Sequence, residues 1–235
     1  MWKVELFGDA FDLDELTLAM SNTEPSVEKT PRGYFLKSAI FEGLTSINEV
    51  EAAALELLPV LNGICKLLLG TRNPIEIAGF TKTVPGQPRE VYVSIEEKGF
   101  SRDSFSTTTL KSDGSVESTH QADPVAPWIG IAVKDESVAK VFRILNVPQV
   151  SWSELYKIFE VIEQDVKGST SIVNLGWASS KSMRRFKHTA NSPSATGDLS
   201  RHGVDQGMPP AAPLSISEAQ ALIYSLIHNW LQAKA

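Results

Sequence analysis

Apolar and polar residues alternate in several short stretches of the N-terminal half. In the opening sequence WKVELF, Val4 and Leu6 alternate with charged residues, which is typical of a strand with one buried face. The turn sequence Thr-Pro-Arg-Gly at residues 30–33 predicts a hairpin. Two more hairpins are predicted around PGQP at residues 85–88 and around SDG at residues 112–114. Together these patterns predict a small, mainly antiparallel sheet.

Most other apolar residues recur every three or four positions, as they do on the buried face of a helix. Two of these stripes begin with a capping box, formed by Ser151 with Glu154 and by Ser215 with Glu218. In such a box the hydroxyl and the carboxylate accept hydrogen bonds from N–H groups that a helix start leaves unpaired. We predict helices at residues 12–20, 46–69, 138–145, 152–166, 179–190 and 215–234.

Helix boundaries and changes in composition define the expected domain organisation. Asp12 is a candidate N-cap for the first helix, and Pro59 predicts a kink or a restart within the long second helix. Residues 118–127 have the composition of a linker. We therefore expect an α+β fold in which residues 1–125 form a small, mainly antiparallel sheet with one long helix. A C-terminal helical bundle is expected at residues 126–235.

Charge is unevenly distributed along the chain. The 235 residues carry a formal net charge of −6, and their hydrophobic content of 42% is ordinary for a globular protein. Residues 151–235 hold eight basic and seven acidic residues, which leaves −7 for residues 1–150. The N-terminal part therefore disfavours nucleic acid, whereas positive charge is concentrated at residues 181–187.

The chain has the features expected of a cytoplasmic protein. Its first residues include several acids and no long apolar run, unlike a signal peptide. The most apolar segment, residues 52–69, is interrupted by Glu56, Pro59 and Lys66, which argues against a membrane span. The single cysteine, Cys65, lies in an apolar run typical of a core, and it excludes an intramolecular disulfide. We expect no association with a membrane.

Cationic and small polar residues make FKHTANSPSATGDLSRHG, residues 186–203, the main candidate site. A guanidinium can hold a phosphodiester while an imidazole transfers a proton, and Arg184 and His188 share one face of the predicted helix. The candidate catalytic residues are Arg201, His202 and His188, and the candidate substrate-binding residues are Arg184, Arg185, Asn191 and Asp198. In the alternative interpretation the same side chains tie a structural loop to neighbouring helices.

The stretch TANSPSATGD within this region favours turns and caps. Pro193 should stop the preceding helix, and Asp198 is a candidate cap for a short helix that carries Arg201. The backbone of this loop could cradle a phosphate, or the loop could be a structural connection. Glu160 and Glu163 lie off the apolar stripe, which favours a solvated face over metal binding. No cluster has metal-ligand spacing, so we expect neither metal nor cofactor.

Residues 151–232 resemble a group of uncharacterised bacterial proteins in the series W..LYK.FEVI..DV, RFKHTANS, GD.SRHG and PP..P...SEAQ.LI..L...WL. More distantly, the C-terminal half resembles the HEPN helical domains of bacterial defence and toxin systems. Several of those domains are metal-independent ribonucleases, with an arginine, a polar residue and then a histidine in their motif. Arg201 and His202 match the first two positions, and no histidine follows at residues 205–207. The resemblance implies a helical bundle and a defence setting.

The sequence leaves two main functions open. In the first, the chain is an interaction or structural protein in a bacterial defence or stress system, and its helical half binds a protein partner or a second copy. In the second, it is a metal-independent ribonuclease or phosphodiesterase with RNA as the substrate, in which Arg201 holds the phosphate and His202 or His188 transfers the proton. A small-ligand sensor with a pocket in the N-terminal sheet is a third alternative. The incomplete catalytic set favours the interaction protein.

Overall fold

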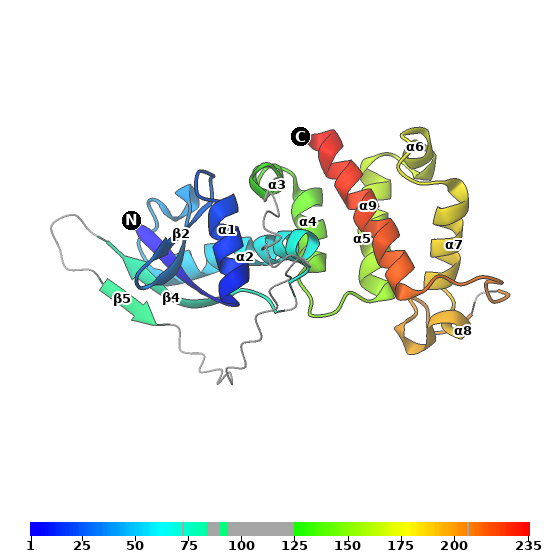
Figure 1. Ribbon diagram of the computed structural model, residues 1–235, viewed down its shortest axis with the longest axis horizontal. Coiled ribbons are helices and arrows are strands. Elements are labelled where there is room, and N and C mark those ends of the chain that lie inside the picture. The colour runs from blue at the N-terminus through cyan, green and yellow to red at the C-terminus, as the bar shows by residue number, and fades with distance from the viewer. Residues whose placement is uncertain (72, 84–89, 94–124, 206) are drawn as a thin grey trace, which may run out of the picture. The chain divides into compact units, whose positions relative to one another are not determined.

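The computed structural model describes residues 1–71, 73–83, 90–93, 125–205 and 207–235. It shows an α+β protein with an antiparallel sheet at the N-terminus, one long helix and a helical C-terminal half (Figure 1), which confirms the predicted fold class. The hairpin predicted at residues 112–114 and most of the predicted linker lie outside the described residues.

The chain divides into two compact units. Met1–Glu51 and Glu76–Ala126 belong to the first unit, and Ala52–Ile75 and Pro127–Ala235 belong to the second. The predicted domains, 1–125 and 126–235, place residues 52–75 with the sheet, whereas these residues cluster with the C-terminal helices. Helix α2 (Ile47–Leu69) therefore starts in one unit and continues in the other.

The first unit is built on an antiparallel sheet with the strand order β2-β3-β1-β4-β5. The strands are β1 (Trp2–Phe7), β2 (Ser26–Thr30), β3 (Gly33–Lys37), β4 (Glu76–Lys82) and β5 (Glu90–Val93), and a 3-10 turn, η1 (Ala39–Phe41), follows β3. β2 and β3 form the hairpin predicted at residues 30–33, and β4 pairs with β5 as predicted for the second hairpin. Gly33 has a backbone φ of +135°, which residues other than glycine rarely adopt.

Alternation along β1 separates a buried face of the sheet from a more exposed one. Trp2, Val4 and Leu6 are buried, whereas Lys3 and Glu5 between them are only partly buried. This pattern confirms the strand that the first residues predict.

Helix α1 (Ala10–Ala19) packs against β2 and buries its apolar stripe. Its N-cap is Asp9, whose carboxylate accepts hydrogen bonds from the backbone N–H groups of Phe11 and Asp12. The prediction of Asp12 as the cap is therefore wrong, because the helix begins one turn earlier. Burial and the neighbouring Asp9 carboxylate raise the pKa of Asp12 to about 6.

Helix α2 runs without interruption through Pro59, so the helix does not restart there. The missing N–H of proline removes one hydrogen bond without ending the helix. The chain leaves the helix at Gly70, whose φ of +67° supplies the left-handed conformation common after a helix. Among the described residues, α2 alone is long and apolar enough to cross a membrane by length and composition, and 56% of its most apolar window is buried inside the protein.

The C-terminal half consists of helices. They are α3 (Val125–Ala132), α4 (Glu136–Leu145), α5 (Trp152–Asp165), α6 (Ser169–Asn174), α7 (Ser180–Ala190), α8 (Pro193–Thr196) and α9 (Ile216–Lys234), with a 3-10 turn, η2 (Gly197–Leu199), after α8. Both predicted capping boxes form, at the starts of α5 and α9. The sequence did not predict α3, α6 and α8, because such short helices show too little of a helical period.

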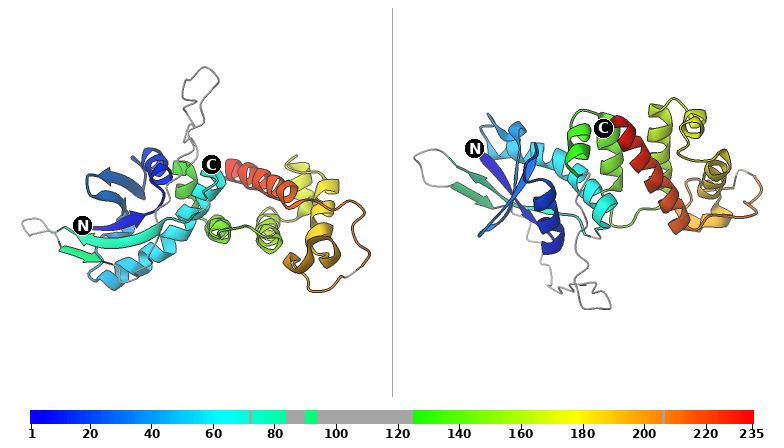
Figure 2. Two further views of the ribbon diagram at one scale, coloured as in Figure 1. Left: turned by 60° about the horizontal axis from the view of Figure 1, so that its bottom comes forward. Right: turned by 45° about the horizontal axis from the view of Figure 1, so that its top comes forward.

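Aromatic side chains of α5 and α7 form the centre of the helical core. α5 packs against α4, α7 and α9, and Figure 2 shows it beside α7 and α9. The rings of Trp152, Tyr156 and Phe159 on α5 lie 6.4, 5.9 and 5.7 Å from the Phe186 ring of α7, measured between centroids. All four side chains are buried, so they stabilise the fold through apolar burial and ring contacts.

Candidate functional site

The candidate residues predicted from the sequence lie on α7 and on the chain that follows it, within the second unit (Figure 1). Beyond α7, the short α8 and η2 lead into irregular chain that continues to α9. We call residues 197–205 and 207–213 the anchored segment. Side chains from α5, α7 and the start of α8 hold it at several points.

Arg201 ties the anchored segment to α5. Its Nη2 donates a hydrogen bond to Glu160 Oε1 at 2.8 Å, and its guanidinium carbon lies 4.1 Å from the centroid of the Tyr156 ring. Its backbone N–H donates to the carbonyl of Ala190 at 2.9 Å. A carboxylate thus neutralises the charge of Arg201, and the guanidinium makes a cation–π contact with an aromatic ring. These contacts support the structural interpretation of Arg201.

α7 holds the later part of the anchored segment. His188 Nε2 lies 2.9 Å from the carbonyl oxygen of Met208, and the tautomer protonated at Nε2 donates to that oxygen. Arg185 donates from Nε to the carbonyl of Ala212 at 2.7 Å and from Nη2 to the carbonyl of Pro213 at 3.0 Å. Both predicted site residues therefore bind backbone groups of the protein itself.

Asp205 fastens the middle of the anchored segment to the start of α8. It accepts a hydrogen bond from Ser192 Oγ at 2.5 Å, and from Ser194 through Oγ at 3.1 Å and through N–H at 3.2 Å. These hydrogen bonds, above all the one from Ser192, lower the pKa of Asp205 below its usual value. Sequence analysis missed this residue, because Asp205 and the serine-rich turn become neighbours only after folding.

Two predicted site residues lie outside these contacts. Arg184 is exposed, and its Nε donates to the carbonyl of Ser180, one turn earlier, at 3.3 Å. His202 is partly buried, and its backbone N–H donates to Ser200 Oγ at 3.4 Å. No described contact links the imidazole of His202 to Arg184 or His188.

Asn191 and Asp198 lie on either side of α8, at the end of α7 and within η2. Asn191 ends α7, its Nδ2 lies 3.5 Å from the Tyr156 hydroxyl, and its buried Oδ1 has no hydrogen-bond partner among the described residues. Asp198 lies exposed within η2 and caps no helix. The prediction that Asp198 caps a helix carrying Arg201 is wrong, because the chain is irregular at Arg201. Pro193 begins α8, after α7 has ended at Ala190.

Three large apolar side chains of the anchored segment face solvent. Leu199, Val204 and Met208 are 63%, 72% and 85% exposed. Val204 adjoins the fixed Asp205, and the carbonyl of Met208 is itself held by His188. The segment therefore combines a fixed backbone with exposed apolar side chains.

Acidic residues of α5 bind cations from other segments. Glu163 accepts hydrogen bonds from Lys187 Nζ at 2.8 Å and from the Ser169 hydroxyl, much as Glu160 binds Arg201. Burial acts to raise the pKa of Glu163, but the hydrogen bonds from Lys187 and Ser169 outweigh it and the pKa lies below its usual value. Glu163 therefore connects α5 to α6 and α7, and Glu160 connects α5 to the anchored segment, which are more specific roles than the expected solvated face.

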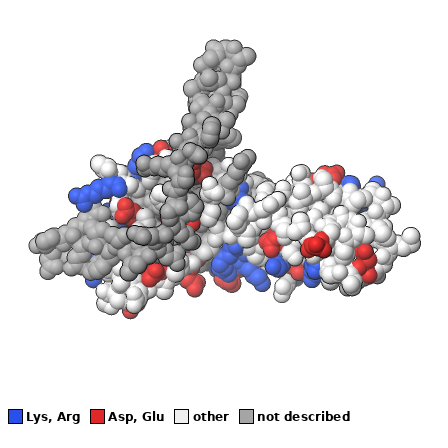
Figure 3. All heavy atoms as spheres, turned by 90° about the horizontal axis from the view of Figure 1, so that it is seen from below, with Lys and Arg blue, Asp and Glu red and all other residues white. Residues whose placement is uncertain are grey.

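Charges of opposite sign are interspersed on the helical half. On the face shown in Figure 3, Lys and Arg atoms of this half lie among Asp and Glu atoms and form no continuous basic field. On α7, however, Lys181 and Arg184 make no ion pair with any described residue. Two cations on this helix thus lack an acidic partner within the described chain.

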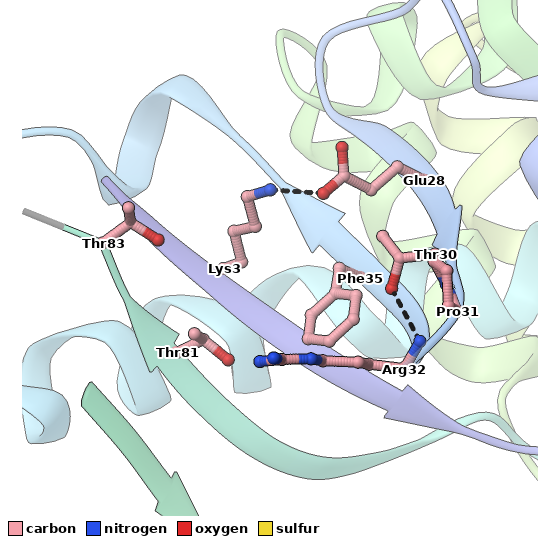
Figure 4. Close-up of a pocket in the computed structure, with 8 residues that line it drawn as sticks. All are labelled: Lys3, Glu28, Thr30, Pro31, Arg32, Phe35, Thr81 and Thr83. Atoms are coloured by element: carbon pink, nitrogen blue, oxygen red, sulfur yellow. Dashed lines mark hydrogen bonds and ion pairs between the residues drawn. The ribbon is translucent and has the colours of Figure 1, made fainter. Parts of the chain in front are cut away.

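A second candidate site lies on the partly exposed face of the sheet in the first unit. It is a cavity of about 270 Å³ (Figure 4). Its lining residues are Lys3, Glu28, Thr30, Pro31, Arg32, Phe35, Thr81 and Thr83. The pairing explains this grouping, since Lys3 lies opposite Thr81 and Glu28 lies opposite Phe35, and directly opposed residues share a face. We call this cavity the sheet pocket.

Both oxygens of the one carboxylate in the sheet pocket are bound by lysines. Glu28 accepts a hydrogen bond from Lys3 at one oxygen, and Lys37 Nζ lies 2.8 Å from the other. Burial acts to raise the pKa of Glu28, but the two lysines outweigh it and the pKa lies below its usual value. Arg32 is exposed, and no ion pair of its guanidinium is found among the described residues.

Neither site holds a group of three or more His, Cys, Asp and Glu side chains placed to bind a metal, within the part of the chain that the structure describes. Comparisons of the chain with protein-family models, with curated proteins and with solved structures found no match. The function therefore has to be inferred from the two sites themselves.

Sequence analysis left open a ligand pocket in the N-terminal sheet but identified none of its residues, and it missed the exposed residues of the anchored segment. The alternation of apolar and polar residues along each strand does predict that Lys3 and Thr81 lie on the face opposite the buried apolar residues of their strands. It does not reveal that β1 lies between β3 and β4, and that order brings Arg32 near Thr81. The exposed Leu199, Val204 and Met208 carry no local signal, because isolated apolar residues in a loop are equally compatible with burial.

Proposed function

We propose that this protein is a cytoplasmic interaction protein that binds a protein partner through the anchored segment of its helical half, and that it is not an enzyme. The observation that carries the proposal is the geometry at Met208. Its carbonyl oxygen lies 2.9 Å from His188 Nε2, while its side chain is 85% exposed. A fixed backbone that displays an apolar side chain is preorganised for binding, because less conformational entropy is lost on association.

Leu199 and Val204 extend the same surface. Both are large, apolar and more than half exposed, and both belong to the anchored segment. Grouped exposed apolar residues are typical of interaction sites, and a methionine among them adapts to the shape of a partner. The three side chains therefore supply the apolar anchors of the proposed interface.

Neighbouring charges indicate the chemistry of the partner. Lys181 and Arg184 lie on α7, and Arg184 precedes His188 by one helical turn on the same face. Neither cation has an acidic partner among the described residues. A partner segment with apolar side chains beside acidic ones fits this surface, because the charges would speed and orient association.

The ribonuclease or phosphodiesterase alternative has no comparable observation in its favour. Its phosphate-binding group would be Arg201, whose guanidinium already binds Glu160 and Tyr156. A phosphate would have to displace that carboxylate. The defence or stress setting rests only on the distant resemblance of the C-terminal half to HEPN domains, and both stay predictions.

The test compares the full-length protein with two triple variants. Leu199→Ser, Val204→Ser and Met208→Ser remove the apolar side chains of the anchored segment. Phe11→Ser, Leu18→Ser and Leu55→Ser provide the matched control, since these three residues are 63%, 70% and 57% exposed elsewhere in the chain. Circular dichroism and melting temperatures establish that all three proteins fold.

A partner retained on the wild-type protein is identified, purified and titrated against each variant. We expect saturable binding to the wild type and the control, and at least a tenfold weaker affinity for the anchored-segment variant, because buried apolar anchors dominate interface energies. Lys181→Glu combined with Arg184→Glu should slow association. Equal binding by both triple variants would contradict the proposal. Light scattering provides a further check, since a dimer abolished by the anchored-segment variant would mean that the occupant is a second copy.

A further inference from the structure

The sheet pocket offers a second binding surface, independent of the anchored segment. Its walls come from β1, β2, β3, the β2–β3 turn and the end of β4, all within the first unit. In Figure 4, the side chain of Arg32 extends from the turn along Phe35 toward Thr81. The pocket is thus lined by a guanidinium on one side and by hydroxyl and ammonium groups on the other.

The charge balance in the pocket favours an anionic ligand. Lys3 and Lys37 both bind Glu28, so this carboxylate is already neutralised from two sides. Glu5 lies on the same face, opposite Phe35, but does not line the cavity. Arg32 remains as a cation at the cavity with no ion pair among the described residues. An incoming anion would provide the partner that the guanidinium lacks.

The arrangement of donors indicates which anion. A carboxylate is flat and has two oxygens, and one guanidinium satisfies it. The pocket adds the ammonium group of Lys3 and the hydroxyl group of Thr83, whereas the Thr30 hydroxyl already donates to the carbonyl of Gly33 at 3.2 Å. Donors that approach from several directions suit a tetrahedral oxyanion with three or four oxygens.

We infer that the sheet pocket binds the phosphate group of a small metabolite, with Arg32 as the principal contact and Lys3 and Thr83 as further donors. A volume of about 270 Å³ lies below the 300–1,000 Å³ common for ligand pockets, so the ligand is a short phosphate monoester or free phosphate. The exposed position of Arg32 leaves it accessible to a ligand from solution.

Isothermal titration calorimetry of the full-length protein tests this inference with three probes. Inorganic phosphate and glycerol 3-phosphate distinguish free phosphate from a monoester, and acetate tests whether any small anion suffices. Arg32→Gln removes the guanidinium charge, and Arg32→Lys keeps a charge but loses the planar fork. Lys140→Gln is the matched control, because Lys140 of α4 is also an exposed cation without an ion pair among the described residues.

We expect saturable binding of at least one phosphate probe to the wild type and to Lys140→Gln. Arg32→Gln should weaken it by about tenfold or more, and Arg32→Lys by less, because a bidentate charge-assisted contact is lost in the first and partly replaced in the second. The inference is wrong if phosphate probes produce no saturable heat at millimolar concentration, or if Arg32→Gln binds them as tightly as Lys140→Gln does. Acetate that binds as tightly as phosphate would overturn the assignment of a phosphate site.

Discussion

The guanidinium carbon of Arg201 lies over the Tyr156 ring of α5, 4.1 Å from its centroid, while Glu160 of the same helix accepts a hydrogen bond from the guanidinium at 2.8 Å. Two residues one helical turn apart on α5 thus hold one side chain of the anchored segment. Arg201 and Glu160 are 41 positions apart in the sequence. Their contact helps to fix the backbone of the anchored segment, which is irregular at Arg201. Its contribution to stability can be measured directly.

Arg201→Ala should lower the free energy of unfolding by about 1–2 kcal/mol, because it removes a cation–π contact and leaves Glu160 without its partner. Arg184→Ala is the matched control and should stay within about 0.5 kcal/mol of the wild type, as is usual for surface substitutions. Urea unfolding followed by circular dichroism measures both. A double-mutant cycle with Glu160→Gln should show a coupling of roughly 0.5–1 kcal/mol. Equal effects of the two alanine variants would mean that Arg201 does not anchor the segment.

Metal-independent RNA cleavage should be absent. The wild type is compared in EDTA with Arg201→Ala/His202→Ala at matched purity, and gel electrophoresis detects the products. We expect no cleavage by either protein and a lower melting temperature for the double variant, since Arg201 serves as a structural contact. Cleavage by the wild type that disappears in a folded double variant would establish the ribonuclease function instead, because loss of a general acid or base costs roughly 10²–10⁴-fold.

Gly63→Ala should destabilise the second unit by about 2–3 kcal/mol. A Cβ at Gly63 of α2 would lie 2.0 Å from the backbone carbonyl oxygen of Phe142 in α4, so the two helices would have to separate. Gly130→Ala in α3 is the control, since a Cβ there meets nothing within 4 Å, and it should be neutral or stabilising by up to about 1 kcal/mol. Thermal unfolding distinguishes them. A Gly63→Ala protein as stable as the control would show that α2 and α4 do not approach so closely.

Asp12→Asn should stabilise the protein in a pH-dependent manner. The pKa of Asp12 is raised to about 6, so the folded state binds more protons than the unfolded state between about pH 4 and pH 6. The stability of the wild type therefore falls as pH rises through this window, whereas asparagine does not titrate. The free energy of unfolding of the variant relative to wild type should therefore increase by about 1 kcal/mol from pH 4 to pH 7, after allowance for the partial exposure of Asp12. Melting temperatures of both proteins, measured across this pH range, test this. A difference that stays constant with pH would contradict the raised pKa.

Much of the secondary structure was predictable, because its signals are local. The capping boxes at Ser151 and Ser215 and the apolar stripes behind them marked α5 and α9 correctly. The turn before Gly33 marked the first hairpin. The cap of α1 was missed because Asp9 and Asp12 have equally suitable side chains and only the path of the backbone distinguishes them. The membership of residues 52–75 depends on packing, which no local pattern reports.

From its order of residues alone, the chain specified an α+β fold, the main helices and the concentration of cations and histidines at residues 181–203. It did not specify what those side chains bind. Only the tertiary structure shows that Arg201 contacts Tyr156 and Glu160 and that His188 lies within hydrogen-bond distance of the Met208 carbonyl. It also shows that Arg32 lines a pocket in the sheet. The physical reason is that periodicity and capping act between residues a few positions apart. The use of a charged side chain depends instead on which distant acceptors the packed helices and strands bring within hydrogen-bond distance.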